Sequence, residues 1–456
     1  MNRLINESET STTIQELCAE YKKNNSITKD EYRDNRVKRG LRNDDGTGVM
    51  AGLTHVCNVH GYLIDDGDKV PDDGKLTYRG INLLDIINGC QSEGRFCYEE
   101  IVWLLIFGKL PDKRQYDRIS HLLYENRELP EYFPEDVIMK NPSKDIMNKM
   151  ARAVLTLYSY DEDPEDLSLE NNMRESISLI ARLPAIMSYA YQVKRRQFDK
   201  KTMFFHPFDP NHKTAEAILN AVREDRQFTD EEARLLDLCL AIHAEHGGGN
   251  NSTFTTRVLT SAETDIYSTM AAAIGSLKGF RHGGANHKVL LMMRDIMDNI
   301  ENWENEDEIE NYLERIIRKE VGDKSGLIYG MGHAIYTRSD PRAVILKAKA
   351  KELAKKKPGF EEKFALYERI EKLAPEAFLK AKGSSKAICA NVDFYSGLVY
   401  EMLGLPEEIY TPLFAVARIT GWCAHRIEEL TTGGRIMRPA YRALPTKQIY
   451  IPLEKR

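Results

Sequence analysis

Helical periodicity is the feature that most limits how this chain can fold. Apolar residues recur every three or four positions over most of its length, as in "CYEEIVWLLIFGKLP" (97–111), where the pattern stops at Gly-Lys-Leu-Pro. Such spacing places one apolar stripe on a helix and buries it. The helices predicted on this basis lie within 97–111 and at about 12–24, 114–126, 145–159, 173–193, 213–221, 229–245, 263–278, 286–300, 306–320, 341–356, 361–380, 393–404 and 411–430.

One segment departs from this periodicity. Residues 54–80, "THVCNVHGYLIDDGDKVPDDGKLTYRG", combine β-branched and aromatic residues with Asp-Gly pairs, which is typical of short strands and tight turns. Glycine interrupts the helical pattern at 246–251 and 322–332, and the proline-punctuated tail from 433 is expected to be extended. We therefore predict an all-α fold with minor β-structure near residues 54–80.

Charge and cysteine content narrow the class of protein. The 456 residues carry a net charge of −6, which argues against nucleic-acid and membrane-surface partners because both attract basic segments. The start of the chain has no apolar secretory core, and the longest apolar runs are too short to span a bilayer. The seven cysteines form no CxxC pair. A reduced cytoplasmic protein with mostly buried, apolar cysteines is predicted.

The first candidate for chemistry is His282, in "KGFRHGGANHKV" (278–289). Apolar residues after it follow helical spacing, so we predict a helix that begins near Asn286. A helix start attracts negative charge and disfavours a protonated imidazole. A neutral His282 there can donate a hydrogen bond to a developing oxyanion. The alternative is a histidine that only caps the helix.

The second candidate is "GLIYGMGHAIYTRSDPRA" (326–343), in which three glycines lead to His333. Ser339 or Asp340 can cap a helix whose first turn holds a proline and Arg342. The Arg342 guanidinium and the helix N-terminus can then share one carboxylate. The stretch is neither a P-loop nor a GxGxxG motif. The alternative is a glycine turn beside an ordinary surface arginine.

The third candidate is Asp393, in "ANVDFYSG" (390–397). Its apolar neighbours penalise the charged form and would make it a stronger base than a free carboxylate. The alternative is an aspartate that caps the following helix.

Two further stretches contain histidines and arginines. In "HAEHGGGNNSTFTTR" (243–257), His243 and His246 have HxxH spacing. No Cys or carboxylate cluster completes a metal site there, and HExxH is absent, so a hydrogen-bonding histidine at a helix end is favoured. In "ARITGWCAHRIEELTTGGRIMRPAYR" (417–442), Arg418 and Arg438 are candidates for anion binding. Trp422 and His425 in the same stretch are predicted to pack in the core.

Taken in order, these stretches resemble the citrate synthase family, which includes 2-methylcitrate synthases. The similar pieces are "HAEHGGGNNSTF", "AAAIGSLKGFRHGGAN", "YGMGHAIYTRSDPRA", "NVDFYSG" and "ARITGWCAH…RP". The resemblance runs from "GKLTYRGINLLDI" (74–86) to "RPAYR" (438–442) and so covers most of the chain.

The resemblance implies a catalytic trio of His282, His333 and Asp393. Asp393 would remove a proton from the methyl group of acetyl-CoA, and His282 would hydrogen-bond the thioester oxygen of the resulting enolate. His333 would polarise the carbonyl of oxaloacetate, which the enol carbon attacks. Hydrolysis of citryl-CoA would release citrate and CoA. No metal and no cofactor are implied, because the CoA thioester is a substrate.

Binding roles and partners follow from the same resemblance. His246, Arg342 and Arg418 would hold the carboxylates of oxaloacetate. Arg438 would reach in from the neighbouring subunit of a homodimer. The residues implied to line the CoA site are Leu327, Ile328, Gly330, Gly332 and Asn391. Thr337 stands where many members carry a basic residue, so a CoA phosphate contact is not predicted there.

The family fold implies a large helical domain, 1–285 with 397–456, and a smaller helical domain, 286–396, that closes over the active site. Closure would keep reactive intermediates away from water. The alternatives to a citrate synthase are a 2-methylcitrate synthase that uses propionyl-CoA, a lyase that cleaves citryl-CoA, a metallohydrolase built on His243 and His246, and a non-catalytic helical scaffold. The first differs by about one methyl group in the acyl pocket, worth roughly 1–3 kcal/mol of discrimination.

Overall fold

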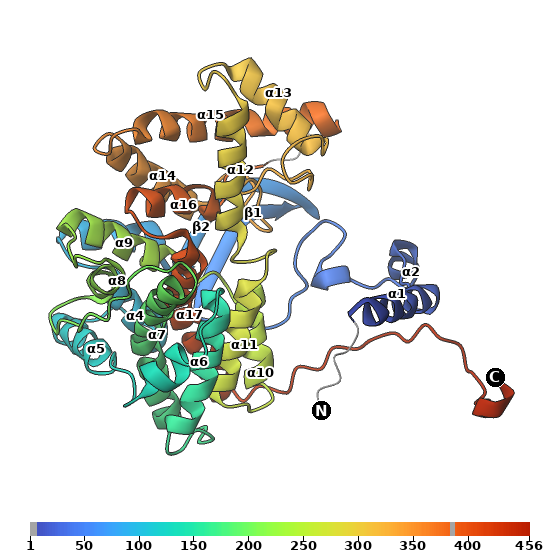
Figure 1. Ribbon diagram of the computed structural model, residues 1–456, viewed down its shortest axis with the longest axis horizontal. Coiled ribbons are helices and arrows are strands. Elements are labelled where there is room, and N and C mark those ends of the chain that lie inside the picture. The colour runs from blue at the N-terminus through green and yellow to red at the C-terminus, as the bar shows by residue number, and fades with distance from the viewer. Residues whose placement is uncertain (1–6, 384–387) are drawn as a thin grey trace. The chain divides into compact units, whose positions relative to one another are not determined.

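The computed structural model describes residues 7–383 and 388–456 (Figure 1). The chain forms two compact units, one of residues up to Met50 together with Arg438–Arg456, and one of Ala51–Met437. The first unit contains helix α1 (Glu7–Asn24), helix α2 (Lys29–Asp34) and 3₁₀ turns at Arg39–Leu41 and Leu453–Lys455. The predicted helix near 12–24 and the extended tail beyond 433 are thereby confirmed.

The second unit opens with a β-hairpin. Its strands are β1 (Cys57–Asp65), β2 (Asp68–Tyr78) and the short β3 (Ile81–Asn82), in the antiparallel order β1-β2-β3. Asp66 and Gly67 both have positive φ, as a two-residue hairpin turn requires. The β1–β2 register shifts between His60 and Tyr62, which marks a bulge. The strands predicted within 54–80 are confirmed.

Helices make up almost all the rest of this unit. They are α3 (Leu83–Ser92), α4 (Tyr98–Phe107), α5 (Lys113–Glu125), α6 (Ile146–Leu157), α7 (Leu169–Gln197), α8 (Thr214–Val222), α9 (Asp230–His243), α10 (Asn251–Thr260), α11 (Ile266–Lys278), α12 (Ala285–Asn299), α13 (Glu306–Ile317), α14 (Pro341–Ala354), α15 (Phe360–Lys382), α16 (Val392–Met402) and α17 (Tyr410–Thr431), with a π-helical turn at Pro134–Met139 and 3₁₀ turns at Tyr158–Tyr160 and Glu407–Ile409. The predicted all-α fold is confirmed.

Three helices were not predicted: α2, α3 and α10. The sequence of α10, "NSTFTTRVLT", follows three glycines and is rich in β-branched and hydroxyl residues, which have low helix propensity. Its Ser252, Thr253 and Thr256 are buried, and the helix packs against α11 and α17. Tertiary packing therefore sustains a helix that local sequence does not favour.

Helix α17 runs through the core of the second unit. It packs against α4, α7, α9, α10 and α11, and nearly all its side chains are buried. In Figure 1, α12–α16 gather at one end of this unit and α4–α11 with α17 at the other, with β1 and β2 between the two groups. The polar residues of α17 are thus placed deep in the protein. The domain boundaries after residues 285 and 396 stay a prediction.

The cysteines are mostly buried, as the sequence analysis predicts. All seven cysteines are free, and every one except Cys18 is buried, so most serve as small apolar side chains. Over the residues that the structure describes, no helix combines the length and apolar character that a bilayer crossing requires.

Candidate active site

Asp393 has a carboxylate that is left unpaired. It lies in the first turn of α16, and its Oδ1 is buried without a hydrogen-bond partner. The helix cap is Asn391, whose Oδ1 accepts a hydrogen bond from the Asp393 backbone N–H at 3.0 Å. The alternative that Asp393 caps the helix is therefore wrong. Burial raises the pKa of Asp393 to about 7, against the lowering effect of Arg342. A carboxylate with such a pKa suits a general base at neutral pH.

Asn391 also ties a glycine loop to the start of α16. Its backbone N–H donates to the Gly330 carbonyl at 2.8 Å, and its Nδ2 donates to the Gly332 carbonyl at 2.9 Å. Gly330 has φ +78°, and a Cβ there would lie 2.8 Å from the Phe394 ring. Two further residues expected to contact CoA precede these glycines: Leu327 is exposed and Ile328 is buried.

His282 lies three residues before the start of α12, close to the predicted helix boundary. Gly284 is the N-cap and receives no side-chain cap, so the alternative of a capping histidine is wrong. The His282 Nε2 is 3.0 Å from the Oγ of Ser252, and Trp422 Nε1 donates to the same oxygen at 3.2 Å. Burial, followed by the charge of Arg418, lowers the pKa of His282 to about 4. The imidazole is therefore neutral at physiological pH.

His333 has a defined tautomer. Its Nδ1 accepts hydrogen bonds from the backbone N–H groups of Ile335 and Tyr336, each at 3.1 Å. Because Nδ1 accepts, a neutral ring carries its proton on Nε2, a tautomer assigned from these bonds. The ring stacks on Tyr336 with centroids 4.5 Å apart and meets His246 edge-on at 5.1 Å. The Nε2–H of His333 can thus serve as a neutral donor.

Asp340 and Arg342 organise the start of α14. Asp340 caps the helix through the Arg342 backbone N–H at 3.0 Å, and its two oxygens bind the guanidinium at 3.0 and 2.7 Å. The backbone N–H of Val392 also donates to Asp340, which joins α14 to α16. The predicted cap is confirmed. Arg342 is buried, so the alternative of an ordinary surface arginine is wrong.

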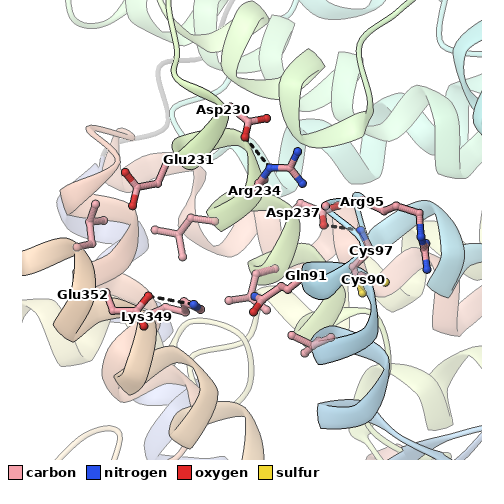
Figure 2. A pocket seen from close by; sticks show the side chains of 15 residues that line it. Cys90, Gln91, Arg95, Cys97, Asp230, Glu231, Arg234, Asp237, Lys349 and Glu352 are labelled. Carbon is pink, nitrogen blue, oxygen red and sulfur yellow. Dashed lines mark hydrogen bonds and ion pairs between the residues drawn. The ribbon is translucent and has the colours of Figure 1, made fainter.

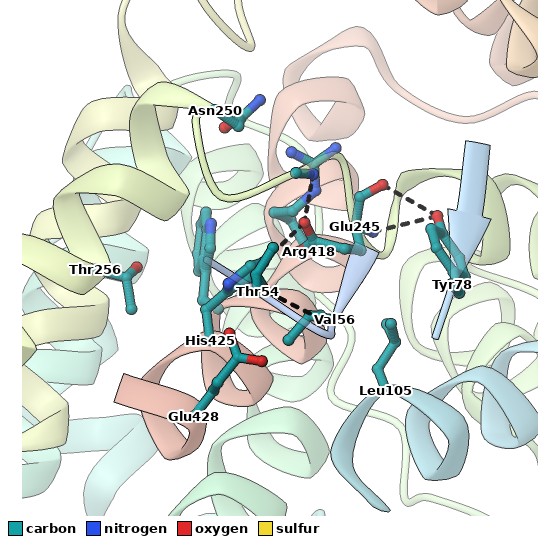
Figure 3. A network of polar contacts seen from close by, with 12 residues as sticks. Thr54, Val56, Tyr78, Leu105, Glu245, Asn250, Thr256, Arg418, His425 and Glu428 are labelled. Carbon is teal, nitrogen blue, oxygen red and sulfur yellow. Dashed lines mark hydrogen bonds and ion pairs between the residues drawn. The ribbon is translucent and has the colours of Figure 1, made fainter. Parts of the chain in front are cut away.

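Arg418 is a buried cation with unbonded terminal nitrogens. Its Nε donates to the His243 carbonyl at 2.6 Å, whereas Nη1 and Nη2 are buried without a hydrogen-bond partner (Figure 3). Burial lowers the pKa of Arg418 to about 10, so the side chain remains charged at neutral pH. A buried guanidinium with a free fork is suited to bind a carboxylate through two parallel hydrogen bonds.

His243 and His246 have different environments. His243 Nδ1 bonds the Cys239 carbonyl at 2.7 Å within α9, as predicted for a histidine at a helix end. His246 lies beyond the helix, and its Nε2 is 3.2 Å from the hydroxyl of Tyr336. Burial lowers the pKa of both rings, to about 3 for His243. Within residues 7–383 and 388–456 no group of three or more His, Cys, Asp or Glu side chains is arranged to hold a metal ion.

A buried polar network supports the segment that carries His246 (Figure 3). Glu245 accepts from the Gly247 backbone N–H at 2.5 Å, and its carboxylate is 3.0 Å from His425 Nε2. Arg257 donates to His425 Nδ1 and pairs with Glu429. Trp422 and His425 are fully buried, as predicted, but each also makes hydrogen bonds that the sequence analysis did not foresee.

The predicted residues converge. Arg342 and Arg418 act electrostatically on Asp393 and on His246, Arg418 also acts on His282, and the ring centroids of His246 and His333 lie 5.1 Å apart. One cluster therefore contains the buried His246, Arg342 and Arg418 and the partly buried His282, His333 and Asp393. Arg438 is exposed and belongs to the other compact unit.

Sequence reasoning missed two residues of this cluster, Ser252 and Tyr336. Ser252 lies in the first turn of α10, a helix that was not predicted, and Tyr336 lies in an irregular segment without a motif of its own. Their partners are 30 and 90 residues away, at His282 and His246. For Ser252 the only sequence signal is its position inside a stretch that resembles the family.

A separate pocket of about 350 Å³ lies between α3, α9 and α14 (Figure 2). Cys90, Cys97, Arg234 and Lys349 are among its lining residues, and none of the clustered residues contributes to its wall. Asp237 accepts hydrogen bonds there from the backbone N–H groups of Cys97 and Tyr98.

Comparison with known proteins gives consistent matches. The family model described as citrate synthase, C-terminal domain, matches residues 45–440. A citrate synthase of Synechocystis sp. is 32% identical over 93% of this chain and 95% of its own. The 2-methylcitrate synthase 2 of Corynebacterium glutamicum is 30% identical over 92% of this chain and 98% of its own. A citrate synthase of Thermoplasma acidophilum, solved as a ternary complex with carboxymethyl coenzyme A and oxaloacetate, superposes with a TM-score of 0.75 at 26% identity, over 92% of this chain and 99% of that one.

Proposed function

This chain belongs to the citrate synthase family of condensing enzymes, and from that premise we propose that it joins acetyl-CoA to oxaloacetate and hydrolyses the citryl-CoA product to citrate and CoA. One observation carries the proposal: a carboxylate with an unpaired buried oxygen and a buried arginine with unpaired terminal nitrogens lie in one cluster with three imidazoles. The carboxylate is the proposed base, and the arginine and imidazoles are the proposed ligands and hydrogen-bond donors.

Asp393 is the proposed base. Its unpaired Oδ1 is free to accept a proton from the methyl carbon of the thioester. The elevated pKa narrows the gap in proton affinity between the carboxylate and a very weak carbon acid. A base alone does not overcome that gap, so stabilisation of the enolate oxygen is also required.

His282 and His333 are the proposed neutral donors. His282 would donate from Nδ1 to the thioester oxygen, which requires its Nε2 to accept a hydrogen bond from the Ser252 hydroxyl, 3.0 Å away. His333 would donate from Nε2 to the carbonyl oxygen of oxaloacetate, because its Nδ1 is engaged by two backbone N–H groups. Donors already placed for the developing charge need no reorganisation, and each is typically worth about 2.7–4 kcal/mol of transition-state stabilisation.

The carboxylates of oxaloacetate are assigned to Arg418, Arg342 and His246. Arg418 has both terminal nitrogens available, whereas the charge of Arg342 is balanced by Asp340. Oxaloacetate is a dianion, and Arg418 is the arginine of this cluster that is not bonded to a carboxylate. We therefore assign a further cation to Arg438 of a second subunit in a homodimer.

The glycine loop is the proposed CoA site. Leu327, Ile328, Gly330, Gly332 and Asn391 would line the adenine and pantetheine. Asn391 ties the backbone of this loop to the first turn of α16. A thioester held by the loop would thereby be placed against Asp393. The smaller domain, 286–396, would close the site.

A 2-methylcitrate synthase is the second candidate. Relatives with that name are 30% and 28% identical over 92% and 93% of this chain, close to the values of the citrate synthases. Because propionyl-CoA differs from acetyl-CoA by one methyl group, a small change in the acyl pocket interconverts the two preferences.

The test is to supply purified protein with oxaloacetate and either acetyl-CoA or propionyl-CoA and to follow free thiol. We expect thiol release with acetyl-CoA that requires oxaloacetate. A marked preference for propionyl-CoA in kcat/KM would assign the chain to the methylcitrate branch. Absence of oxaloacetate-dependent thiol release with both thioesters would overturn the proposed function.

A further inference from the structure

Tyr336 lies among the proposed oxaloacetate ligands but has no role in the mechanism above. It is 2% exposed, and its hydroxyl is 3.2 Å from His246 Nε2. Its ring stacks on His333 at a centroid distance of 4.5 Å and an interplanar angle of 29°. The Arg342 guanidinium lies 5.8 Å from the ring centre. One side chain thus lies beside three of the groups assigned to oxaloacetate, one of them from a distant segment of the chain.

The hydroxyl can fix the tautomer of His246. Burial raises the pKa of Tyr336 above its usual range, so the hydroxyl keeps its proton. The pKa of His246 is lowered well below its usual value, so its ring is neutral and one nitrogen must accept. A hydrogen bond from the Tyr336 hydroxyl to Nε2 leaves the ring proton on Nδ1. His246 is then a donor at Nδ1, which is what a carboxylate ligand requires.

The β1–β2 hairpin packs directly against Tyr336. A Cβ on Gly61 would lie 2.7 Å from the Tyr336 Cα, and a Cβ on Gly74 would lie 2.8 Å from its Cδ1. Thr337 donates from Oγ1 to the Gly61 carbonyl at 2.5 Å, and the Gly74 backbone N–H donates to Ser339 Oγ at 3.2 Å. The backbone after His333 therefore lies directly on β1 and β2, where two glycines leave room for the ring.

We propose that Tyr336, backed by the β1–β2 hairpin, is a positioning residue for the keto acid. Its hydroxyl holds His246 as an Nδ1–H donor, and its ring holds the imidazole of His333 against the substrate carbonyl. The proposal rests on the proposed function, because it takes oxaloacetate as the ligand of these histidines. The two parts of the side chain have different roles: the hydroxyl affects the affinity for oxaloacetate, and the ring affects kcat.

Two substitutions separate these parts, and a third is the control. Tyr336→Phe removes the hydroxyl and keeps the ring, whereas Tyr336→Leu removes both. Tyr116→Phe, in α5, deletes a comparable hydroxyl that donates to the Phe96 carbonyl at 3.2 Å, away from the cluster. Oxaloacetate affinity is measured by calorimetry without acyl-CoA, and kcat and KM by thiol release.

For Tyr336→Phe we expect the Kd and KM of oxaloacetate to rise about fivefold, the typical worth of one net hydrogen bond. Its kcat should fall less than its KM rises, and its KM for acetyl-CoA should not change. For Tyr336→Leu we expect a further loss of about tenfold in kcat, because His333 loses its stacked support. Tyr116→Phe should match the wild type in every kinetic constant.

Unchanged oxaloacetate affinity in Tyr336→Phe would overturn the proposal, as would equal losses in Tyr336→Phe and Tyr116→Phe. Because Tyr336→Phe preserves packing, this comparison stands even if Tyr336→Leu does not fold. If the wild type itself neither binds nor turns over oxaloacetate, both the proposed function and the role of Tyr336 fall. If the wild type binds and turns over while Tyr336→Phe is normal, only the role of Tyr336 falls.

Discussion

At the scale of single residues, the proposed site contains two ionisable side chains with buried atoms that have no hydrogen-bond partner, Asp393 and Arg418. Native proteins pair nearly all buried polar atoms, because an unmade hydrogen bond costs about 1–3 kcal/mol. Arg418 lowers the pKa of Asp393, yet neither the Asp393 Oδ1 nor the terminal nitrogens of Arg418 are bonded. In the proposed function, bound substrate supplies the missing partners, so the cost to the free protein supports binding and catalysis.

The first prediction concerns the pH dependence of Asp393. Its folded pKa of about 7 exceeds the ordinary value of 3.8. If Asp393 is the base, kcat/KM should fall about tenfold per pH unit below pH 7, a limb that the neutral His282 does not obscure. Asp393→Asn should lower kcat by about 10²–10⁴-fold. A pH–rate profile with its acid limb near pH 4 would contradict this assignment.

The raised pKa of Asp393 also makes the stability of the protein depend on pH. A carboxyl whose pKa is raised by folding favours the folded state at low pH, and that contribution is lost as pH rises from about 4 through 7. Asp393→Asn does not titrate. The free energy of unfolding of Asp393→Asn minus that of the wild type should therefore be larger at pH 8 than at pH 5, by on the order of 1–3 kcal/mol. Urea denaturation of both proteins at the two pH values measures the difference.

The second prediction compares two buried arginines of α17. Arg418 has unbonded terminal nitrogens, whereas Arg426 bonds Asn172, Thr264 and neighbouring hydroxyls. Arg418→Met should leave the free protein equally or more stable but reduce kcat/KM about 100-fold or more. Arg426→Met should instead destabilise the fold by about 1–3 kcal/mol, because the buried oxygens of Asn172 and Thr264 lose their donor.

Thermal unfolding with and without oxaloacetate distinguishes the arginines further. Oxaloacetate should raise the Tm of the wild type and of Arg426→Met, provided that the latter folds, but not that of Arg418→Met. A normal oxaloacetate-induced shift in Arg418→Met would remove Arg418 from the binding site.

At the scale of elements, the site is built where irregular segments meet helix starts. The glycine loop at 326–333 is hydrogen-bonded to residues 389–391. Asn391 donates hydrogen bonds to two carbonyls of this loop, and its side chain also caps α16. Asp340 similarly caps α14 and binds the start of α16. Because one residue bonds both segments, a movement of one segment shifts the other. A displacement of the loop should therefore also displace Asp393.

The third prediction tests this coupling with two glycines of positive φ. Gly330 would place a Cβ against Phe394, whereas Gly404, at φ +66°, has open space around it. Gly404→Ala should cost about 1 kcal/mol from the backbone alone. Gly330→Ala should cost more and also raise the KM for acetyl-CoA, because the loop must move. Equal kinetic constants in the two variants would show that the loop and the thioester site are independent.

At the scale of the whole molecule, the proposed site combines groups from two subunits. Arg342 is hydrogen-bonded to Asp340, whereas the terminal nitrogens of Arg418 have no hydrogen-bond partner. Arg438 is the proposed complement from a second subunit. A site shared in this way across a two-fold axis would make catalysis depend on assembly, since an isolated subunit would lack Arg438.

The fourth prediction is complementation between inactive subunits. Asp393→Asn and Arg438→Ala should each be nearly inactive as homo-oligomers. A hetero-oligomer purified through two different tags should recover about half of the wild-type activity, because one of its two sites receives no substitution. Asp393→Asn paired with Arg418→Met is the control and should recover none, since both residues act in the same subunit. No recovery in the first pairing would show that Arg438 acts in its own subunit, and an active Arg438→Ala homo-oligomer would place Arg438 outside the site.

Much of the fold and part of the site follow from local sequence. The periodic apolar pattern predicts nearly all the helices, since burial of one face depends on spacing alone. The helix start after His282 and the cap at Asp340 are local as well, because capping groups lie within a few residues of the N–H groups that they satisfy. Helix α10 was missed because burial against α17, and not local propensity, stabilises it.

The sequence by itself determined which residue types are available and which lie at helix ends. Only the tertiary structure decided which polar atoms are paired. Asn391 and not Asp393 caps α16, Ser252 holds His282, and Tyr336 holds His246 across 90 residues of chain. The physical reason is that hydrogen bonding is a short-range interaction. Whether a group is paired or left free for a substrate therefore depends on neighbours that only the packing of distant segments supplies.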